Sequence, residues 1–132
     1  MELLLSRHSE IEGLGELPEI ANIARSIPNY PTGHPDLGED ALSQYAEQYL
    51  TVSQQFATTS KPHKINKMPT NYFSIGLIHA LFPKAPILHI ARDPMATAWT
   101  NYRRNYITGQ TYASDLSDIA AFMALHGKLM AH

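Results

Sequence analysis

The chain has 132 residues, 44% of them hydrophobic, no cysteine and a formal net charge of −2. This length suits one domain, and no apolar run reaches the ~18 residues that a bilayer-spanning helix needs. The absence of cysteine excludes disulfides, thiolate zinc sites and cysteine nucleophiles. The N-terminus lacks the basic start, apolar middle and cleavage site of a signal peptide, so we expect a cytoplasmic protein without membrane contact.

Charge is distributed unevenly along the chain. Residues 1–50 hold nine acidic and two basic residues, whereas residues 61–104 hold seven basic residues and one acidic residue. The basic middle of the chain can face an anionic ligand, or acidic helices can simply cover a basic sheet edge. Charge indicates partners rather than folds, so both interpretations stay open.

Three helices are expected in the first part of the chain. A turn over residues 9–15 follows the first helix, and a loop rich in proline and glycine over residues 28–38 follows the second. The second helix starts near Pro18 and has apolar residues at i, i+3, i+4 and i+7. Asp40 is placed to cap the third helix. The predicted helices span residues 1–8, 18–27 and 40–56.

The second part of the chain alternates strands and helices. A short strand with its exit is expected over residues 63–68, and a helix from residue 70 or 71 ends before Pro83. The almost continuously apolar run Pro86–Ala91 predicts a strand buried on both faces of a parallel sheet.

Two further helices complete the pattern. Asp93 and Pro94 suit the cap and first residue of a helix through about Tyr106, and Ser114 or Asp115 can open the last helix. The alternation predicts an α/β fold with a short parallel sheet flanked by helices.

Arg92 ends the second predicted strand. Open α/β sheets bind ligands beyond the carboxyl ends of their strands, and a helix N-terminus there attracts anions. The guanidinium can hold a phosphate with two parallel hydrogen bonds, and Thr100, eight residues later, can add a hydroxyl. A surface arginine paired with Asp93, beside an ordinary helix threonine, remains the alternative.

Lys67 and Glu16 are the other two candidates. Lys67 leaves the first predicted strand at the same expected edge, where a lysine can neutralise charge on a transferring group. Lys61 and Lys64, nearby, are interpreted as solvated surface residues. Glu16 lies in a glycine-flanked segment, where a carboxylate can act as a general base. It can equally belong to the N-terminus of the following helix, stabilised by the helix dipole.

The remaining candidates are interpreted as structural. The seven histidines show no His-x-x-x-His spacing, and His79 and His89 lie in apolar segments typical of core histidines, so we expect no metal site. Trp99, Tyr102 and Tyr106 are expected to pack. The chain lacks the short helix pair and basic recognition helix of a helix-turn-helix, so we expect no nucleic-acid partner.

Together these motifs resemble the core of sulfotransferases, particularly the bacterial proteins that append this domain to tetratricopeptide repeats. The similarity covers nearly the whole chain, in order. The segments that carry it are Leu5–Glu10, Gly15–Pro18, Lys67–Tyr72, Gly76–Pro83, Ile87–Pro94 and Tyr112–Leu116.

The resemblance implies a partial P-loop NTPase-like sulfotransferase domain over residues 1–132, which moves a sulfuryl group from 3′-phosphoadenosine 5′-phosphosulfate to an acceptor hydroxyl. It implies that Arg92 and Thr100 bind the 3′-phosphate of this nucleotide co-substrate. Glu16 falls where the related tyrosylprotein sulfotransferases keep a catalytic glutamate, and Lys67 where the family has a lysine near the sulfuryl group. The implied partners are the nucleotide, a hydroxyl acceptor and tetratricopeptide repeats in the parent chain.

One part of the family pattern is missing. The family cradles the 5′-phosphosulfate in a Pro-Arg-Ser-Gly-Thr-Thr-like turn, which this sequence lacks, as it lacks the C-terminal part of the domain. We therefore expect a fragment that binds the donor weakly or not at all by itself. Two alternatives stay open: a non-catalytic helical binding module derived from the sulfotransferase core, and a nucleotide kinase relative, which would need the same turn. The acceptor, whether protein tyrosine, sugar or small molecule, is not specified.

Overall fold

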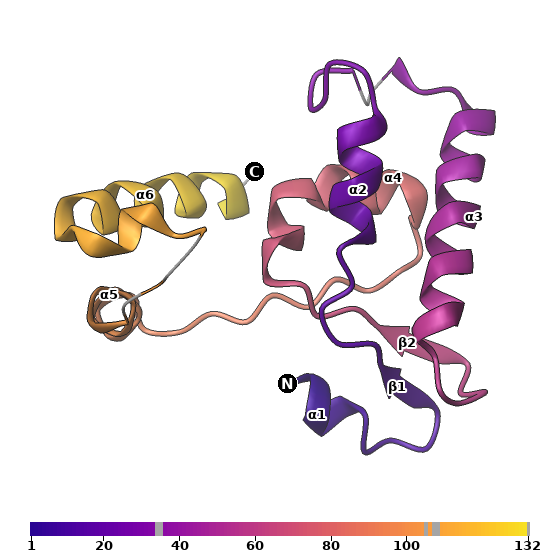
Figure 1. Ribbon diagram of the computed structural model, residues 1–132, viewed down its shortest axis with the longest axis horizontal. Coiled ribbons are helices and arrows are strands. Elements are labelled where there is room, and N and C mark those ends of the chain that lie inside the picture. Colours follow the sequence, from indigo (N-terminus) through magenta and orange to yellow (C-terminus); the bar gives the residue numbers. More distant parts are fainter. Residues whose placement is uncertain (34–35, 105, 107–108, 132) are drawn as a thin grey trace. The chain divides into compact units, whose positions relative to one another are not determined.

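The computed structural model describes residues 1–33, 36–104, 106 and 109–131. The chain forms two compact units, Met1–Pro86 and Ile87–His132, which are described separately (Figure 1). None of the helices in the described residues is long and apolar enough to span a bilayer.

The larger unit contains a parallel pair of short strands and a group of helices. The strands pair in the register Ile11 with His63, Glu12 with Lys64 and Gly13 with Ile65. The short parallel sheet is therefore confirmed, but its first strand lies where we expected only a turn. In chain order the elements are α1 (Glu2–Leu5), β1 (Ile11–Gly13), α2 (Glu19–Ser26), α3 (Glu39–Phe56), β2 (His63–Ile65), a 3₁₀ helix (Pro69–Ser74) and α4 (Ile75–Leu81).

The core of this unit is built from α2, α3 and α4. The stripe predicted on α2 is buried as expected, and α4 adds Leu77 and Leu81 to the same cluster. The partly buried side chains of Leu42, Tyr45 and Tyr49 on α3 pack against it. This packing explains why the i, i+3, i+4 spacing was a reliable signal, since each helix offers one apolar face to the others. The buried residues of the stripe are Ile20, Ile23 and Ala24 on α2 and Ile27 directly after it.

The start of α3 differs from the prediction in detail. The helix begins at Glu39 after Gly38 in extended conformation, and no side chain caps it. Asp40 therefore lies in the first turn rather than at the cap. A carboxylate in that position still faces the positive end of the helix dipole.

The smaller unit contains α5 (Pro94–Arg103), a 3₁₀ turn (Thr111–Ser114) and α6 (Leu116–Ala131). Asp93 caps α5 as predicted, because its Oδ1 accepts a hydrogen bond of 2.7 Å from the Ala96 N–H. The helix stops at Arg103 rather than Tyr106, since Arg104 takes an extended conformation. At α6, Asp115 accepts from the amides of Ser117 and Asp118, which lower the pKa of its carboxyl, Asp118 contributing most.

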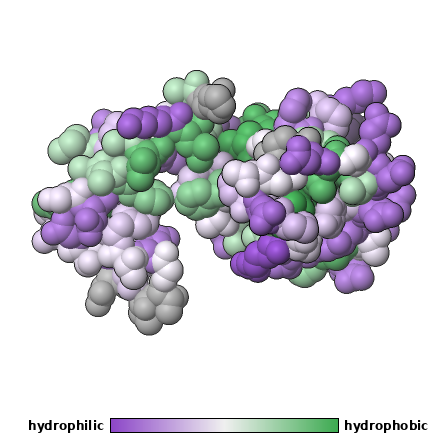
Figure 2. Space-filling view, turned by 90° about the horizontal axis from the view of Figure 1, so that it is seen from above, coloured by the Kyte–Doolittle hydropathy of each residue, from purple (hydrophilic) through white to green (hydrophobic). Residues whose placement is uncertain are grey.

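The strand predicted over Pro86–Ala91 is wrong. The segment is irregular and exposed, with Leu88 65% and Ile90 60% accessible. A strand must pair its N–H and C=O groups with a neighbour, and the described backbone offers this segment no partner. Figure 2 shows apolar patches between the polar groups of the surface, and the exposed apolar side chains of the smaller unit include Leu88, Ile90 and Met95.

Candidate functional site

Glu16 and Lys67 lie beside each other in the larger unit. Their side chains form an ion pair between the segments that leave β1 and β2. Backbone hydrogen bonds continue past the ends of the two strands and so hold Glu16 and Lys67 close together. The Leu14 N–H donates to the Ile65 carbonyl, and the Lys67 N–H donates to the Gly15 carbonyl, each at 2.8 Å. The pair therefore occupies the carboxyl end of a parallel sheet, the edge at which α/β proteins bind ligands.

Gly15 allows the chain to turn between the ladder and Glu16. Its φ of +72° lies in the left-handed region, which other residues adopt only at a cost. Its N–H donates to the Glu2 carboxylate on α1 at 2.6 Å. Since α2 begins only at Glu19, Glu16 lies outside that helix, and the alternative of a residue in the helix N-terminus is wrong.

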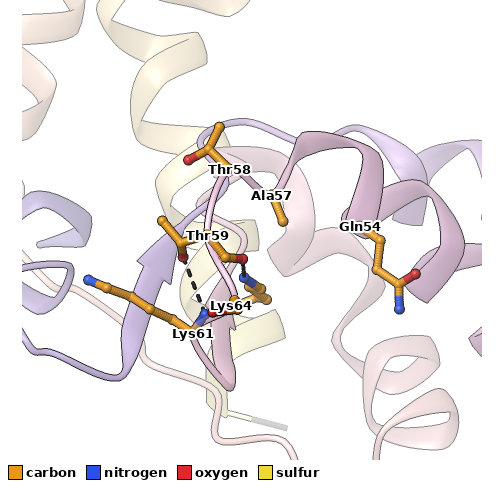
Figure 3. Close-up of a pocket in the computed structure, with 7 residues that line it drawn as sticks. Gln54, Ala57, Thr58, Thr59, Lys61 and Lys64 are labelled. Carbon is orange, nitrogen blue, oxygen red and sulfur yellow. Dashed lines mark hydrogen bonds between the residues drawn. The ribbon is translucent and has the colours of Figure 1, made fainter.

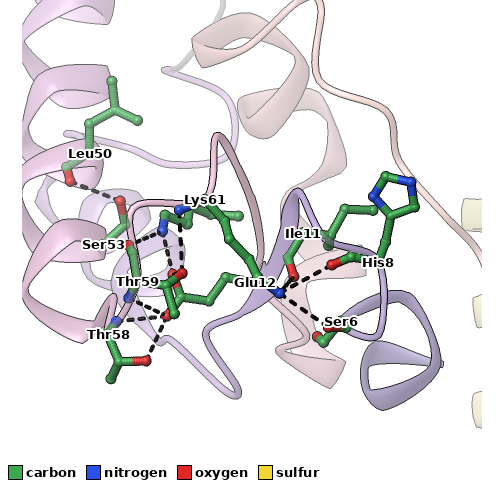
Figure 4. A network of polar contacts seen from close by, with 10 residues as sticks. Ser6, His8, Ile11, Glu12, Leu50, Ser53, Thr58, Thr59 and Lys61 are labelled. Atoms are coloured by element: carbon green, nitrogen blue, oxygen red, sulfur yellow. Dashed lines mark hydrogen bonds and ion pairs between the residues drawn. The ribbon is translucent and has the colours of Figure 1, made fainter.

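A second glutamate–lysine pair crosses the same ladder. Glu12 on β1 is paired with Lys64 on β2 and also accepts hydrogen bonds from the backbone N–H and the hydroxyl of both Thr58 and Thr59, at 2.6–3.1 Å (Figure 4). Its side chain is nearly buried, and Lys64, followed by Thr59 and Thr58, holds the pKa of this carboxyl well below its ordinary value. Glu12 is consequently ionised at neutral pH, and its hydrogen bonds tie the end of α3 to the sheet.

The two pairs differ in what they can do chemically. Every described partner of Glu12 is a protein group that donates a hydrogen bond to it, so the carboxylate oxygens are already occupied and its low pKa makes it a weak base. Glu16, in contrast, has a side chain that is 56% exposed, and that of Lys67 is 44% exposed. Only the pair at the carboxyl end of the strands is accessible to a reacting molecule.

Lys61 is not the solvated residue that we expected, and neither is Lys64. The Lys61 ammonium donates to the carbonyl oxygens of His8 and Ile11, both at 3.1 Å, and of Ser6 at 3.4 Å (Figure 4). It thus closes the loop between α1 and β1. The sequence indicates the charge of these lysines, but Ile11 and Glu12, which accept from Lys61 and Lys64, lie 50 and 52 residues away in the chain.

A hollow of about 470 Å³ lies beside these residues, at the amino ends of the strands. Lys61 and Lys64 contribute to its wall (Figure 3). Both ammonium groups are already engaged by protein oxygens outside the hollow, those of His8 and Ile11 for Lys61 and that of Glu12 for Lys64. The hollow is also at the end of the sheet opposite Glu16 and Lys67. We therefore do not assign it to the candidate site. It is lined by Gln54, Ala57, Thr58, Thr59, Ser60, Lys61 and Lys64.

Arg92 and Thr100 belong to the smaller unit. Arg92 is exposed in the irregular segment before α5, and Asp93 is engaged at the helix cap instead of pairing with it. The half-buried Thr100 donates a hydrogen bond from its hydroxyl to the Ala96 carbonyl at 2.6 Å. Because a hydroxyl has one proton, Thr100 would have to rotate in order to donate to a phosphate. Among the described residues, the ion pairs are Lys64–Glu12 and Lys67–Glu16, so neither involves Arg92.

The expectation that Trp99, Tyr102 and Tyr106 pack holds only in part, since the Trp99 and Tyr102 rings stack on each other at 6.2 Å but stay exposed, and the expectation of core histidines is wrong. Trp99 is 57% and Tyr102 44% exposed, with the Arg103 guanidinium 5.9 Å from the Trp99 ring centre, whereas the half-buried Tyr106 donates to Asn101 at 3.0 Å. His79 and His89 are exposed rather than in the core. No cluster of three or more histidine, aspartate or glutamate side chains suited to a metal ion occurs in the part of the chain that the structure describes.

Comparisons with known proteins show similarity over the whole chain. The family model described as "Sulfotransferase family" matches residues 1–132. An uncharacterized protein of Aquifex aeolicus (strain VF5) is 28% identical over 144 residues, which cover 99% of this chain. The chain spans only 19% of the length of that relative. No solved structure matches.

Proposed function

Because the chain belongs to the sulfotransferase family, we propose that it forms part of a catalytic domain that moves a sulfuryl group from 3′-phosphoadenosine 5′-phosphosulfate to an acceptor hydroxyl. The observation that supports this proposal best is the accessible Glu16–Lys67 pair at the carboxyl ends of β1 and β2. A base beside a cation is what this transfer requires, since one proton must leave the acceptor and negative charge develops on the leaving group.

The two side chains have complementary roles in the proposed reaction. Glu16 takes the proton of the acceptor hydroxyl, whose oxygen then attacks the sulfur in line. As the new oxygen–sulfur bond forms, the bond from sulfur to the bridging phosphosulfate oxygen breaks, and that oxygen keeps the electron pair. Lys67 donates a hydrogen bond to it and stabilises its charge.

We assign the 3′-phosphate of the donor to Arg92 and Thr100. The exposed Arg92 immediately precedes the capped start of α5, and its planar guanidinium suits bidentate phosphate binding. Because we expect the fragment to bind the donor weakly by itself, the test is isothermal titration of the complete parent chain with 3′-phosphoadenosine 5′-phosphate. Arg92→Ala should weaken binding by roughly tenfold or more, since hydrogen bonds to charged groups contribute strongly. Arg25→Ala, an exposed arginine on α2, is the control; equal affinities of the two variants would refute the assignment.

The catalytic pair is tested in the same complete parent chain, by the rate of sulfuryl transfer to tyrosine peptides, sugars and small phenols. Glu16→Gln should lower kcat by roughly 10²- to 10⁴-fold, the range of general-base catalysis. Two single variants of exposed residues, Glu10→Gln and Lys84→Ala, serve as controls and should each retain the wild-type rate. A wild-type rate in Glu16→Gln would exclude the base assignment. A protein that binds the nucleotide and transfers nothing would instead support a non-catalytic binding module.

A further inference from the structure

Asn66 joins the two segments that carry the candidate pair. The Leu17 N–H donates to Asn66 Oδ1 at 3.3 Å, and Asn66 Nδ2 donates to the Leu17 carbonyl at 3.0 Å. One side-chain amide thus pairs with both backbone groups of one residue, as a strand neighbour would. Leu17 directly follows Glu16, and Asn66 directly precedes Lys67.

This amide is itself held from outside the sheet. Its second N–H donates to the Tyr49 hydroxyl on α3 at 3.2 Å. Tyr49 packs against Phe82, with ring centres 5.2 Å apart, and burial raises the pKa of its phenol, which therefore stays neutral. Tyr49 and Leu17 together fix the orientation of the amide, because only one orientation places a donor on the Leu17 carbonyl and an acceptor on the Leu17 N–H.

The contact matters because the ion pair cannot hold its own geometry. The Glu16 and Lys67 side chains are about half exposed, and exposed ion pairs contribute little free energy. Their relative position therefore depends on the backbone. On one side of Glu16, Gly15 is held by the ladder to Lys67. On the other side, Leu17 is held by Asn66, and its side chain is buried.

We propose that Asn66 is a positioning residue for sulfuryl transfer, which acts by clamping the Leu17 backbone and so fixes Glu16 against Lys67. This inference rests on the function proposed above for that pair. Because it acts through geometry, loss of the clamp lowers kcat while the protein stays folded and the KM for the nucleotide stays within about twofold. Misplacement by about 1 Å can cost roughly 100-fold in rate.

Three variants, made in the complete parent chain, separate the parts of the contact. Asn66→Leu has a similar size and removes all three hydrogen bonds. Asn66→Asp keeps an acceptor for the Leu17 N–H but sets a carboxylate oxygen against the Leu17 carbonyl. Tyr49→Phe removes only the outer hydrogen bond. We expect kcat to fall roughly 10- to 100-fold in Asn66→Leu, to a similar extent in Asn66→Asp, and less than about threefold in Tyr49→Phe.

A control separates positioning from general destabilisation. Ile23→Val perturbs the core of the same unit, away from the sheet edge, and should leave kcat unchanged at a temperature where all variants are folded. Hydrogen exchange adds a readout that does not depend on activity. The Leu17 amide should exchange at least about tenfold faster in Asn66→Leu than in Ile23→Val, because it has lost its acceptor.

The outcomes distinguish this inference from the proposed function. If Glu16→Gln is inactive while Asn66→Leu has the kcat of Ile23→Val, the positioning role is wrong and the function stands. If Glu16→Gln keeps the wild-type rate, sulfuryl transfer stands, but the base assignment fails and the positioning role fails with it. If the wild-type protein binds the nucleotide but transfers no sulfuryl group, the proposed function fails. Unchanged exchange of the Leu17 amide in Asn66→Leu would overturn the clamp in all of these cases.

Discussion

Gly15 gives a prediction whose magnitude follows from backbone geometry alone. A Cβ built on Gly15 or on Gly38 meets no atom within 4 Å, so neither Gly15→Ala nor Gly38→Ala creates a clash. The two positions differ in φ, which is +72° at Gly15 and −70° at Gly38. The left-handed region costs an L-residue roughly 1–2 kcal/mol, and we expect Gly15→Ala to be destabilised by about this amount.

The control should behave differently. At Gly38 an alanine restricts the unfolded chain, which stabilises by about 0.4–1 kcal/mol, but it also replaces glycine at a helix N-cap, where alanine is poor. We expect these effects to offset each other to within about 0.5 kcal/mol. Thermal unfolding measures the difference, since 1 kcal/mol corresponds to roughly 4–8 °C for a unit of this size. Gly15→Asn should fall between wild type and Gly15→Ala, because asparagine tolerates this region. Equal stabilities of Gly15→Ala and Gly38→Ala would refute the reasoning.

Three further predictions concern stability. Wild type should have a larger free energy of unfolding than Glu12→Gln at neutral pH, and this difference should shrink as pH falls below about 4.5. The reason is that the folded carboxyl, with its lowered pKa, stays ionised at a pH where the unfolded carboxyl binds a proton. Urea titrations across this pH range test the prediction. Asp93→Ala should destabilise the smaller unit by about 1 kcal/mol through loss of the α5 cap, whereas Asp93→Asn should lose less, as circular dichroism melting will show. Ile23→Ala should cost about 2–5 kcal/mol in the larger unit, against ±0.5 kcal/mol for the exposed Leu3→Ala, by urea unfolding.

The features that the sequence predicted well are local. The apolar stripe of α2 and the Asp93–Pro94 start of α5 depend on residues within one or two helical turns, and both are confirmed. β1 escaped prediction because three residues, Ile-Glu-Gly, are too few to show the alternation of a strand. These residues form a strand because they pair with β2, which follows in the chain only after α2 and α3.

The candidate site shows the same division between local and non-local information. Glu16 and Lys67 could each be chosen from a local motif, a glycine-flanked segment and a strand exit, but their contact required the unpredicted β1. Asn66 was missed because its partners, Leu17 and Tyr49, lie 49 and 17 residues away. The apolar run before Arg92 indicated burial but could not specify a strand partner. The assignment of Arg92 and Thr100 to a phosphate stays a prediction.

Reversal of the charges in the Glu16–Lys67 pair tests whether the pair takes part in catalysis or is an ordinary surface ion pair. The double variant Glu16→Lys with Lys67→Glu keeps opposite charges on the same two backbone positions, which the ladder and Asn66 hold. Because an exposed pair contributes about 0–1 kcal/mol, the unfolding free energy of the double variant should lie within about 1 kcal/mol of wild type. Its rate of sulfuryl transfer should nevertheless be as low as that of Glu16→Gln, since the base and the cation then face the wrong atoms of the reacting groups. Recovery of the rate together with the stability would show that the pair has no directional role, and the proposed chemistry would then have to be assigned to other residues.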